Sequence, residues 1–91
     1  MIRIKKAIPL ENYRLKITFN TNEVGVFDLS SWLDGPIYSK LKNKDIFNHV
    51  VIDEIAGTMV WSNGIDICPD VVYEQTNFAI NENDDVNHHR A

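Results

Sequence analysis

Five residues in the C-terminal third of the chain have side chains that suit a small binding site: two aromatic rings, one amide and two carboxylates. They are Trp61, Asn63, Asp66, Asp70 and Tyr73. Brought together where a hairpin meets a helix, they would form a polar and aromatic pocket for a small ligand or a substrate. Each residue also has a structural explanation, since Asn63 suits a turn and Asp70 suits a helix start. We favour the structural explanation and predict no catalytic residue.

A second candidate is a basic patch of Arg3, Lys5, Arg14 and Lys16. These residues alternate with apolar ones on two predicted strands, which places them on one face. Nucleic acid binds such a patch best when aromatic rings lie among the cations. The nearby ring of Tyr13 is expected on the opposite face, and the net charge is −4. We therefore rank nucleic acid below an acidic protein surface as the partner.

The charges are unevenly distributed along the chain. Residues 1–50 contain eight Lys or Arg and five Asp or Glu, whereas residues 51–91 contain one Arg and eight Asp or Glu. Mutual neutralisation of the two halves across the fold is the favoured explanation, and two differently charged faces or an acidic tail are the alternatives.

The sequence predicts no metal site and no cofactor. Asp84, Asp85, His88 and His89 are ligand types, but no helix signal would hold them together. Cys68 is the only cysteine, so the chain cannot form an internal disulfide. We find neither an apolar run of membrane-spanning length nor a signal-peptide pattern, and we expect a cytoplasmic protein without membrane contact.

The stretch from Gly57 to Tyr73 carries the first candidate site and has strong local signals. Residues 58–61 and 65–67 are typical of strands, and the Asn63-Gly64 pair favours a two-residue hairpin turn between them. Pro69 suits the first turn of a helix, which we expect over residues 69–76.

The N-terminal half predicts three strands, over residues 2–8, 13–19 and 24–29, joined by short turns into an antiparallel meander. The simplest register pairs Ile17 with Ile4 and with Val26, and it sets Lys5 opposite Lys16. A serine-capped helical turn at residues 30–33, a kinked helix at 37–48 with a second turn capped by Asp45, and a strand at 49–55 follow.

These elements define a small α+β domain with an antiparallel β-meander or sheet of about five or six strands and two or three short helices. Residues 1–76 form the single domain, and residues 77–91 are a polar acidic tail that we expect to be disordered. The residues expected to supply much of the core are Tyr13, Leu15, Ile17, Phe19, Val24, Val26, Val50, Ile52, Val60 and Trp61.

Residues 2–76 resemble a bacterial family catalogued as domain of unknown function 2442. The similarity lies in YRLKITFNTNEVGVFDLSSWL, in VVIDEIAGTMVW and above all in WSNGIDICPDVVY. The positions that match the family pattern are Gly57, Thr58, Trp61, Asn63, Gly64, Asp66, Pro69, Asp70 and Tyr73. The resemblance implies a small α+β domain with an antiparallel sheet. It implies no activity, and so it transfers no catalytic residue.

Our leading hypothesis from the sequence is a non-enzymatic protein-interaction or regulatory module in the bacterial cytosol. The alternative is a small-molecule-binding or enzymatic domain that uses the Trp61–Tyr73 region. A lesser alternative is nucleic-acid binding through the basic patch. The expected partner is another protein, or a second copy of the chain, that pairs with the exposed sheet edge formed by residues 2–8.

Overall fold

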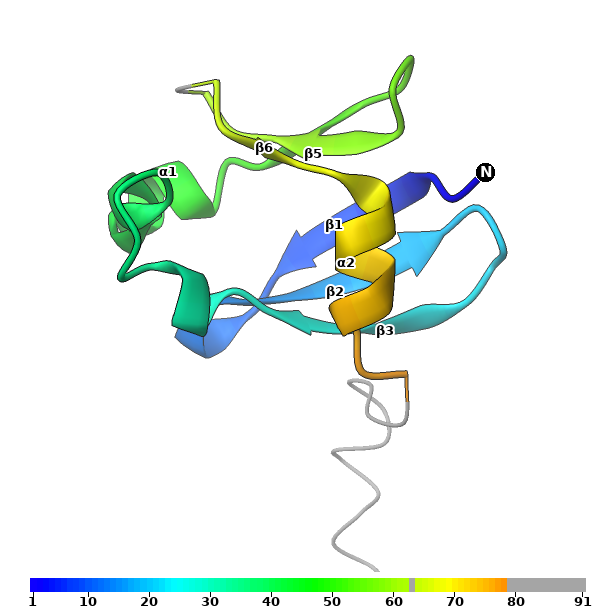
Figure 1. Cartoon of the computed structure of the whole chain (residues 1–91), viewed down its shortest axis with the longest axis horizontal. Helices are drawn as coiled ribbons and strands as arrows, with labels where there is room; N and C mark the ends of the chain where they lie inside the picture. The colour runs from blue at the N-terminus through cyan, green and yellow to red at the C-terminus, as the bar shows by residue number, and fades with distance from the viewer. Residues whose placement is uncertain (63, 79–91) are drawn as a thin grey trace, which may run out of the picture.

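The computed structural model describes residues 1–62 and 64–78. This part of the chain contains six strands in two antiparallel sheets of three. The first sheet consists of β1 (Ile4–Pro9), β2 (Arg14–Phe19) and β3 (Val24–Asp28), and the second of β4 (Val51–Asp53), β5 (Thr58–Val60) and β6 (Asp66–Ile67). The predicted α+β class and strand number are confirmed, and the strands are divided between two sheets (Figure 1).

Strand β2 follows the sequence pattern most closely. Leu15, Ile17 and Phe19 are fully buried on the inner face of the first sheet, whereas the residues between them are only half-buried. Because successive side chains of a strand point to opposite faces, this alternation produces one apolar and one polar face. The inner face of the first sheet therefore forms one wall of the core.

The predicted register of the first sheet is wrong for both strand pairs. Ile17 pairs with Ala7 instead of Ile4, and this shift is already present next to the β1–β2 connection, where Pro9 pairs with Leu15. The bulge at Lys5 then changes the register by one residue, so that Ile4 pairs with Phe19. The turn after β2 places Asn22 at a φ of 72° and closes with a hydrogen bond from Phe19 N–H to the Glu23 carbonyl.

That turn pairs Ile17 with Gly25 instead of Val26. A shift of one residue exchanges the two faces of a strand. Phe27 consequently points into the core opposite Leu15, and Val26 lies on the other face. Lys16 lies opposite Ile8, so the predicted Lys5–Lys16 pair does not form.

The helices occur where the sequence predicts them, with different caps. The segment expected at 37–48 contains a 3₁₀ helix at Ser39–Lys42 and α1 at Lys44–Phe47, and α2 spans Pro69–Gln75. Asn43, rather than Asp45, caps α1, because its side-chain oxygen accepts from the Asp45 N–H at 2.9 Å.

The turn at Ser30–Trp32 has no side-chain cap where a serine cap was predicted, and the Ser30 N–H donates to the Asp28 carboxylate at 2.9 Å. Between β5 and β6, hydrogen bonds from Trp61 N–H to the Ile65 carbonyl and from Gly64 N–H to the Trp61 carbonyl close a three-residue loop. The predicted two-residue hairpin is therefore one residue too short, and Gly64 holds the left-handed position with a φ of +85°.

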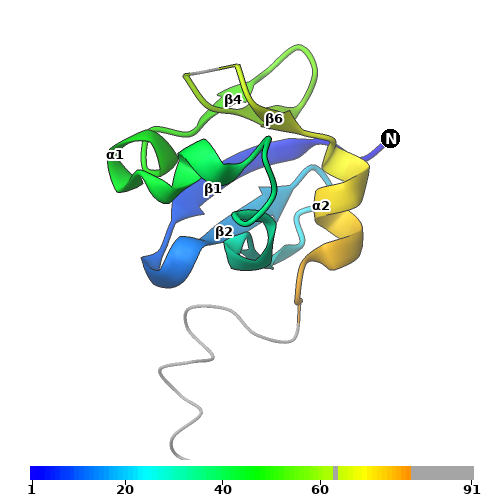
Figure 2. The same ribbon diagram turned by 60° about the vertical axis from the view of Figure 1, so that its left-hand side comes forward.

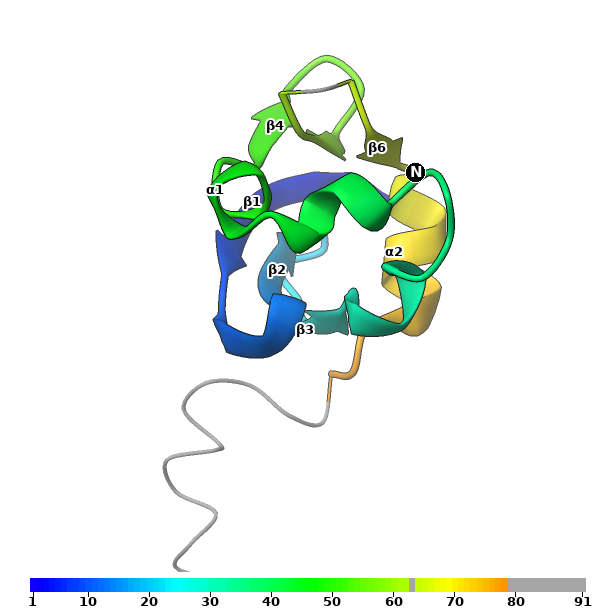
Figure 3. The ribbon, with the colours of Figure 1, turned by 90° about the vertical axis from the view of Figure 1, so that its left-hand side faces the viewer.

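The core lies between the inner face of the first sheet, the second sheet and the helical segments. Figures 2 and 3 show the second sheet above the first, with α1 and α2 on opposite sides of the core. Leu15, Ile17, Phe19, Val26 and Trp61 are buried as expected, whereas the other five expected core residues are only half-buried. The buried residues that the sequence did not single out are Ile4, Phe27, Leu29, Leu33, Leu41, Phe47, Met59, Ile67 and Val72.

The two sheets are connected through the start of β1. Ile4 N–H donates to the Gly57 carbonyl at 2.9 Å, and the Arg3 guanidinium donates to the carbonyls of Glu54 and Ile55 at 2.6 Å. A Cβ on Gly57 would lie 2.7 Å from the Cβ of Arg3. Glycine at this position therefore allows the β4–β5 turn to approach β1.

The outer edge of β3 is covered by the segment that follows α2. Val26 and Asn77 exchange backbone hydrogen bonds of 3.1 and 2.8 Å. A Cβ on Gly25 would lie 2.6 Å from Thr76 Cγ2 and 2.8 Å from the Asn77 carbonyl oxygen. The contacts with the domain thus reach Phe78, and residues 79–91 of the expected tail lie outside the described residues.

Candidate functional site

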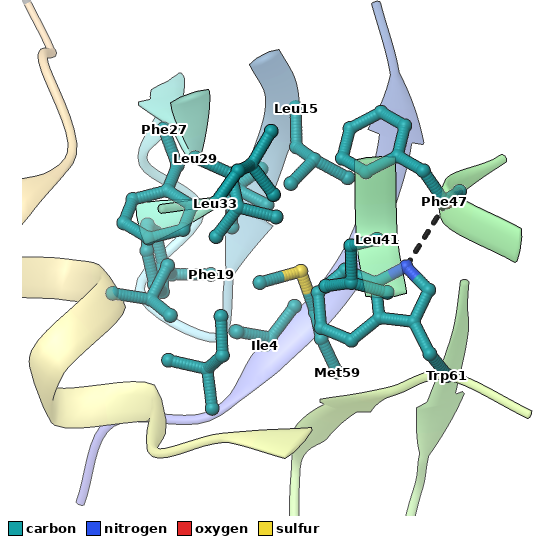
Figure 4. Close-up of a cluster of buried hydrophobic side chains, with 13 residues drawn as sticks. Ile4, Leu15, Phe19, Phe27, Leu29, Leu33, Leu41, Phe47, Met59 and Trp61 are labelled. Atoms are coloured by element: carbon teal, nitrogen blue, oxygen red, sulfur yellow. Dashed lines mark hydrogen bonds between the residues drawn. The ribbon is translucent and has the colours of Figure 1, made fainter. Parts of the chain in front are cut away.

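Trp61, the largest residue of the predicted pocket, is turned into the core. Its side chain is 1% exposed, and its indole N–H donates to the Phe47 carbonyl at 3.0 Å (Figure 4). The bond links the residue that follows β5 to the end of α1. The polar atom that would have contacted a ligand therefore has a structural partner.

Tyr73 connects α2 to the turn between β2 and β3. Its hydroxyl donates to Glu23 Oε1 at 2.7 Å, and its ring packs edge-on against Phe19, with the two ring centroids 5.0 Å apart. The hydrogen bond from Tyr73, followed by one from Thr21, lowers the pKa of Glu23 below its ordinary value. The same Tyr73–Glu23 bond raises the pKa of the Tyr73 phenol.

The remaining members of the predicted pocket do not complete a site around these two rings. Asp66 and Asp70 are exposed, and the backbone carbonyl of Asp66 accepts a hydrogen bond from the Tyr38 hydroxyl at 3.5 Å. Asn63 lies outside the described residues. A ligand site shared by all five residues stays a prediction.

The four residues of the predicted basic patch divide into two groups. Arg3 and Lys5 contact the turns, since the Arg3 guanidinium binds the β4–β5 turn and Lys5 Nζ lies 3.5 Å from Asn22 Oδ1. Arg14 and Lys16 lie on β2, on the face opposite the core. Because of the bulge at Lys5, Lys6 lies directly opposite Thr18 on β1, and its side chain projects from that same face.

We call this surface the outer face of the first sheet and define it by the register. Directly paired residues of antiparallel strands project to the same side. One row consists of Lys6, Thr18 and Val24, and the next of Ile8, Lys16 and Val26. Arg14 and Asp28 form the third row, and the members of the outer face are Lys6, Ile8, Arg14, Lys16, Thr18, Val24, Val26 and Asp28.

The outer face is basic and partly apolar. It carries three cationic side chains and one carboxylate, and Ile8 is 39% exposed beside them. Lys6, missing from the predicted patch, could not be assigned to this face from the sequence, because the bulge that places it there has no sequence signature.

A hollow of about 490 Å³ lies where the β1–β2 connection meets α1. Its lining includes Leu10 and Tyr13 from the connection and Phe47 and Asn48 from the end of α1. The sequence did not predict this hollow, because its two walls are more than 30 residues apart and neither contains a binding motif.

Within residues 1–62 and 64–78, no group of three His, Cys, Asp or Glu side chains is placed to hold a metal ion. The four ligand-type residues of the tail lie outside the described residues. Cys68 is exposed. In the same described part of the chain, no helix has the length and apolar composition needed to cross a membrane.

Two three-stranded antiparallel sheets around one core, with short helices, define a small α+β domain. A family model matches residues 4–77, and the chain belongs to that family, which is described as "Protein of unknown function (DUF2442)". Neither the search of curated proteins nor the search of solved structures found a match.

Proposed function

We propose that this chain is a non-enzymatic protein-interaction module whose outer face binds an acidic protein surface. The observation that carries the proposal is the juxtaposition of Lys6, Lys16 and Arg14 on three neighbouring rows of the outer face, with Ile8 among them. Arginine is enriched in protein interfaces, and complementary charge speeds and orients association.

The composition of the outer face favours a protein over nucleic acid. A single-stranded nucleic acid would use aromatic side chains for stacking, and the outer face has none. Ile8 and Val24 offer an apolar contact that a phosphate backbone would not use. Nucleic-acid binding remains the lesser alternative, and the experiment below separates the two.

The buried polar side-chain groups of the described residues are all satisfied within the fold. Every buried side-chain nitrogen and oxygen among them has a hydrogen-bond partner. This supports a non-catalytic role over the enzymatic alternative in the Trp61–Tyr73 region. The proposal places the module in the bacterial cytoplasm, in line with the family resemblance and the single cysteine.

The test is quantitative affinity capture with three baits from a lysate, with and without nuclease treatment. These are the native chain, the outer-face variant Arg14→Glu with Lys16→Glu, and a control variant Lys40→Glu with Lys42→Glu, which reverses two exposed lysines of the 3₁₀ helix. Thermal unfolding of each bait checks that it is folded.

We expect a set of acidic proteins that the native chain and the control retain and the outer-face variant loses. Equal capture by the two folded variants would overturn the proposal. Capture that disappears only on nuclease treatment would favour the nucleic-acid alternative.

A further inference from the structure

The hollow between the β1–β2 connection and α1 has the size of a small-molecule site. Its volume of about 490 Å³ falls within the range of about 300–1,000 Å³ that is usual for ligand pockets. It is separate from the outer face, because its charged residues, Glu11 and Lys44, do not belong to the rows of β1, β2 and β3.

The apolar floor of the hollow is held in place from behind. The Tyr13 ring packs edge-on against Phe47 with centroids 5.3 Å apart, and the Tyr13 hydroxyl donates to the Lys42 carbonyl at 2.5 Å. Phe47 is fixed in turn, because its carbonyl accepts from the Trp61 indole. The floor is therefore preformed, which lowers the entropy cost of binding a ligand.

The backbone at the wall of the hollow is in an unusual conformation. Asn12 and Tyr13 have φ angles of 62° and 60°, and neither is glycine. Left-handed backbone at two consecutive side-chain-bearing residues is strained, and such strain concentrates at binding sites. The hydrogen bond of Tyr13 to the Lys42 carbonyl and its ring contact with Phe47 keep Tyr13 in this conformation, next to Asn12 in the lining of the hollow.

The rim presents matching polar groups on its two walls. The β1–β2 connection contributes Glu11 and Asn12 to the lining, and α1 with its following residue contributes Lys44 and Asn48. All four residues are exposed at the rim, above the apolar floor. A ligand that satisfies both walls carries an ammonium group, a carboxylate and an apolar body between them.

We propose that this hollow binds a short zwitterionic peptide of two or three residues with an apolar side chain. The peptide carboxylate pairs with Lys44, its ammonium group pairs with Glu11, and its side chain packs on Tyr13 and Phe47. Two extended residues span about 7 Å, so the two charges of a dipeptide lie far enough apart to reach two separate walls. The two rim amides satisfy the peptide group between the charges.

The test is an amide NMR titration of the full chain with the dipeptide Leu-Phe. Its N-acetylated and C-amidated form serves as the uncharged comparison. We expect chemical-shift changes confined to residues 9–13 and 44–48 that saturate at millimolar ligand, with weaker binding of the capped form. No saturable change, changes centred elsewhere, or equal affinity for both forms would overturn the proposal.

Two variants test the charge assignment. Lys44→Met and Glu11→Gln each remove one charge from an exposed site, and each should weaken Leu-Phe binding about two- to fivefold. Lys40→Met is the matched control, since Lys40 is exposed and does not line the hollow. Unchanged affinity in both rim variants would overturn the proposal. Neither result bears on the outer face, whose own variants leave Glu11 and Lys44 intact.

Discussion

At the scale of single residues, Gly64 is required for its backbone angle alone. Its φ is +85°, and a Cβ at this position would meet no atom within 4 Å. We expect Gly64→Val to lower the free energy of unfolding by about 1–3 kcal/mol, because a β-branched residue is strained at this φ.

Urea denaturation measures the loss, with Gly35→Val as the matched control. Gly35 does not have a positive φ, and its added Cβ would make only an ordinary contact of 3.5 Å with the Trp32 carbonyl. Equal losses in the two variants would contradict the explanation from φ.

Tyr73 and Glu23 predict a pH dependence whose sign follows from their shifts. The pKa of Glu23 is lowered from its ordinary 4.5, so its contribution to stability is present above that value and is lost as pH falls through the folded pKa. The pKa of Tyr73 is raised from its ordinary 10.0, so its contribution is present below that value and is lost as pH rises through the folded pKa. The pair therefore stabilises the fold across the neutral range.

The substitution Tyr73→Phe should raise the pKa of Glu23 towards its ordinary value, because it removes the hydrogen bond from Tyr73, the largest cause of the lowering. A carboxyl NMR titration of Glu23 measures this change. The stability difference between native chain and variant should shrink at acidic pH. Tyr38→Phe is the control, because it removes the longer hydrogen bond to the Asp66 carbonyl and should leave the Glu23 titration unchanged. An unchanged Glu23 titration in Tyr73→Phe would refute the role of Tyr73 in lowering the pKa of Glu23.

At the scale of elements, the packing of the Thr76–Phe78 segment on β3 depends on Gly25. Its Cβ position lies 2.6 Å from Thr76 Cγ2 and 2.8 Å from the backbone oxygen of Asn77. We expect Gly25→Ala to cost about 1–3 kcal/mol, as overpacking does, and to displace this segment from β3. Hydrogen exchange at the Val26 and Asn77 amides should become faster, whereas Gly35→Ala should leave both unaffected. Unchanged exchange in Gly25→Ala would contradict this role.

Elements with a regular pattern were predictable, and their relative positions were not. Leu15, Ile17 and Phe19 alternate with polar residues, which fixes both the strand and its buried face. The partner strands depend on a bulge at Lys5 and on a turn residue, Asn22, in the left-handed conformation. The bulge changes the β1–β2 register by one residue, and the turn at Asn22 changes the β2–β3 register by one residue. The spacing of apolar residues along the sequence reveals neither change.

The same limit explains what was predicted of the candidate surfaces. Arg14 and Lys16 could be placed on one face from the period of β2, but the bulge puts Lys6, rather than Lys5, on that face of β1, opposite Thr18. Trp61 and Tyr73 each had a structural explanation, and the hydrogen bonds to Phe47 and Glu23 match it. The hollow forms where the β1–β2 connection packs against α1 and the residue after it. These segments are far apart in the sequence, so local sequence patterns could not predict it.

At the scale of the whole molecule, the sheet edges decide whether a second copy can add a strand. The sequence favoured a homodimer through the edge formed by residues 2–8. In the structure, Ile4 N–H is already bonded to Gly57, Lys5 forms a bulge, and Pro9 has no N–H to donate. Bulges, prolines and covered groups are features that protect an edge from pairing.

The other sheet edges in the described part of the chain are also poor sites for adding a strand from a second copy. Asn77 occupies the outer side of β3 at Val26, and the edge strands of the second sheet, β4 and β6, have three and two residues. Short edges do not support a stable intermolecular sheet. An interaction through the outer face, which needs no free edge, is the mode that this architecture favours.

We therefore expect the purified chain to be a monomer. Light scattering across a dilution series should give a constant mass near 10.5 kDa up to high micromolar concentration. The informative variant is Pro9→Val, which restores a backbone donor on β1 and should increase the tendency to dimerise if Pro9 protects the edge. A concentration-dependent mass near twice that value in the native chain would contradict the monomer.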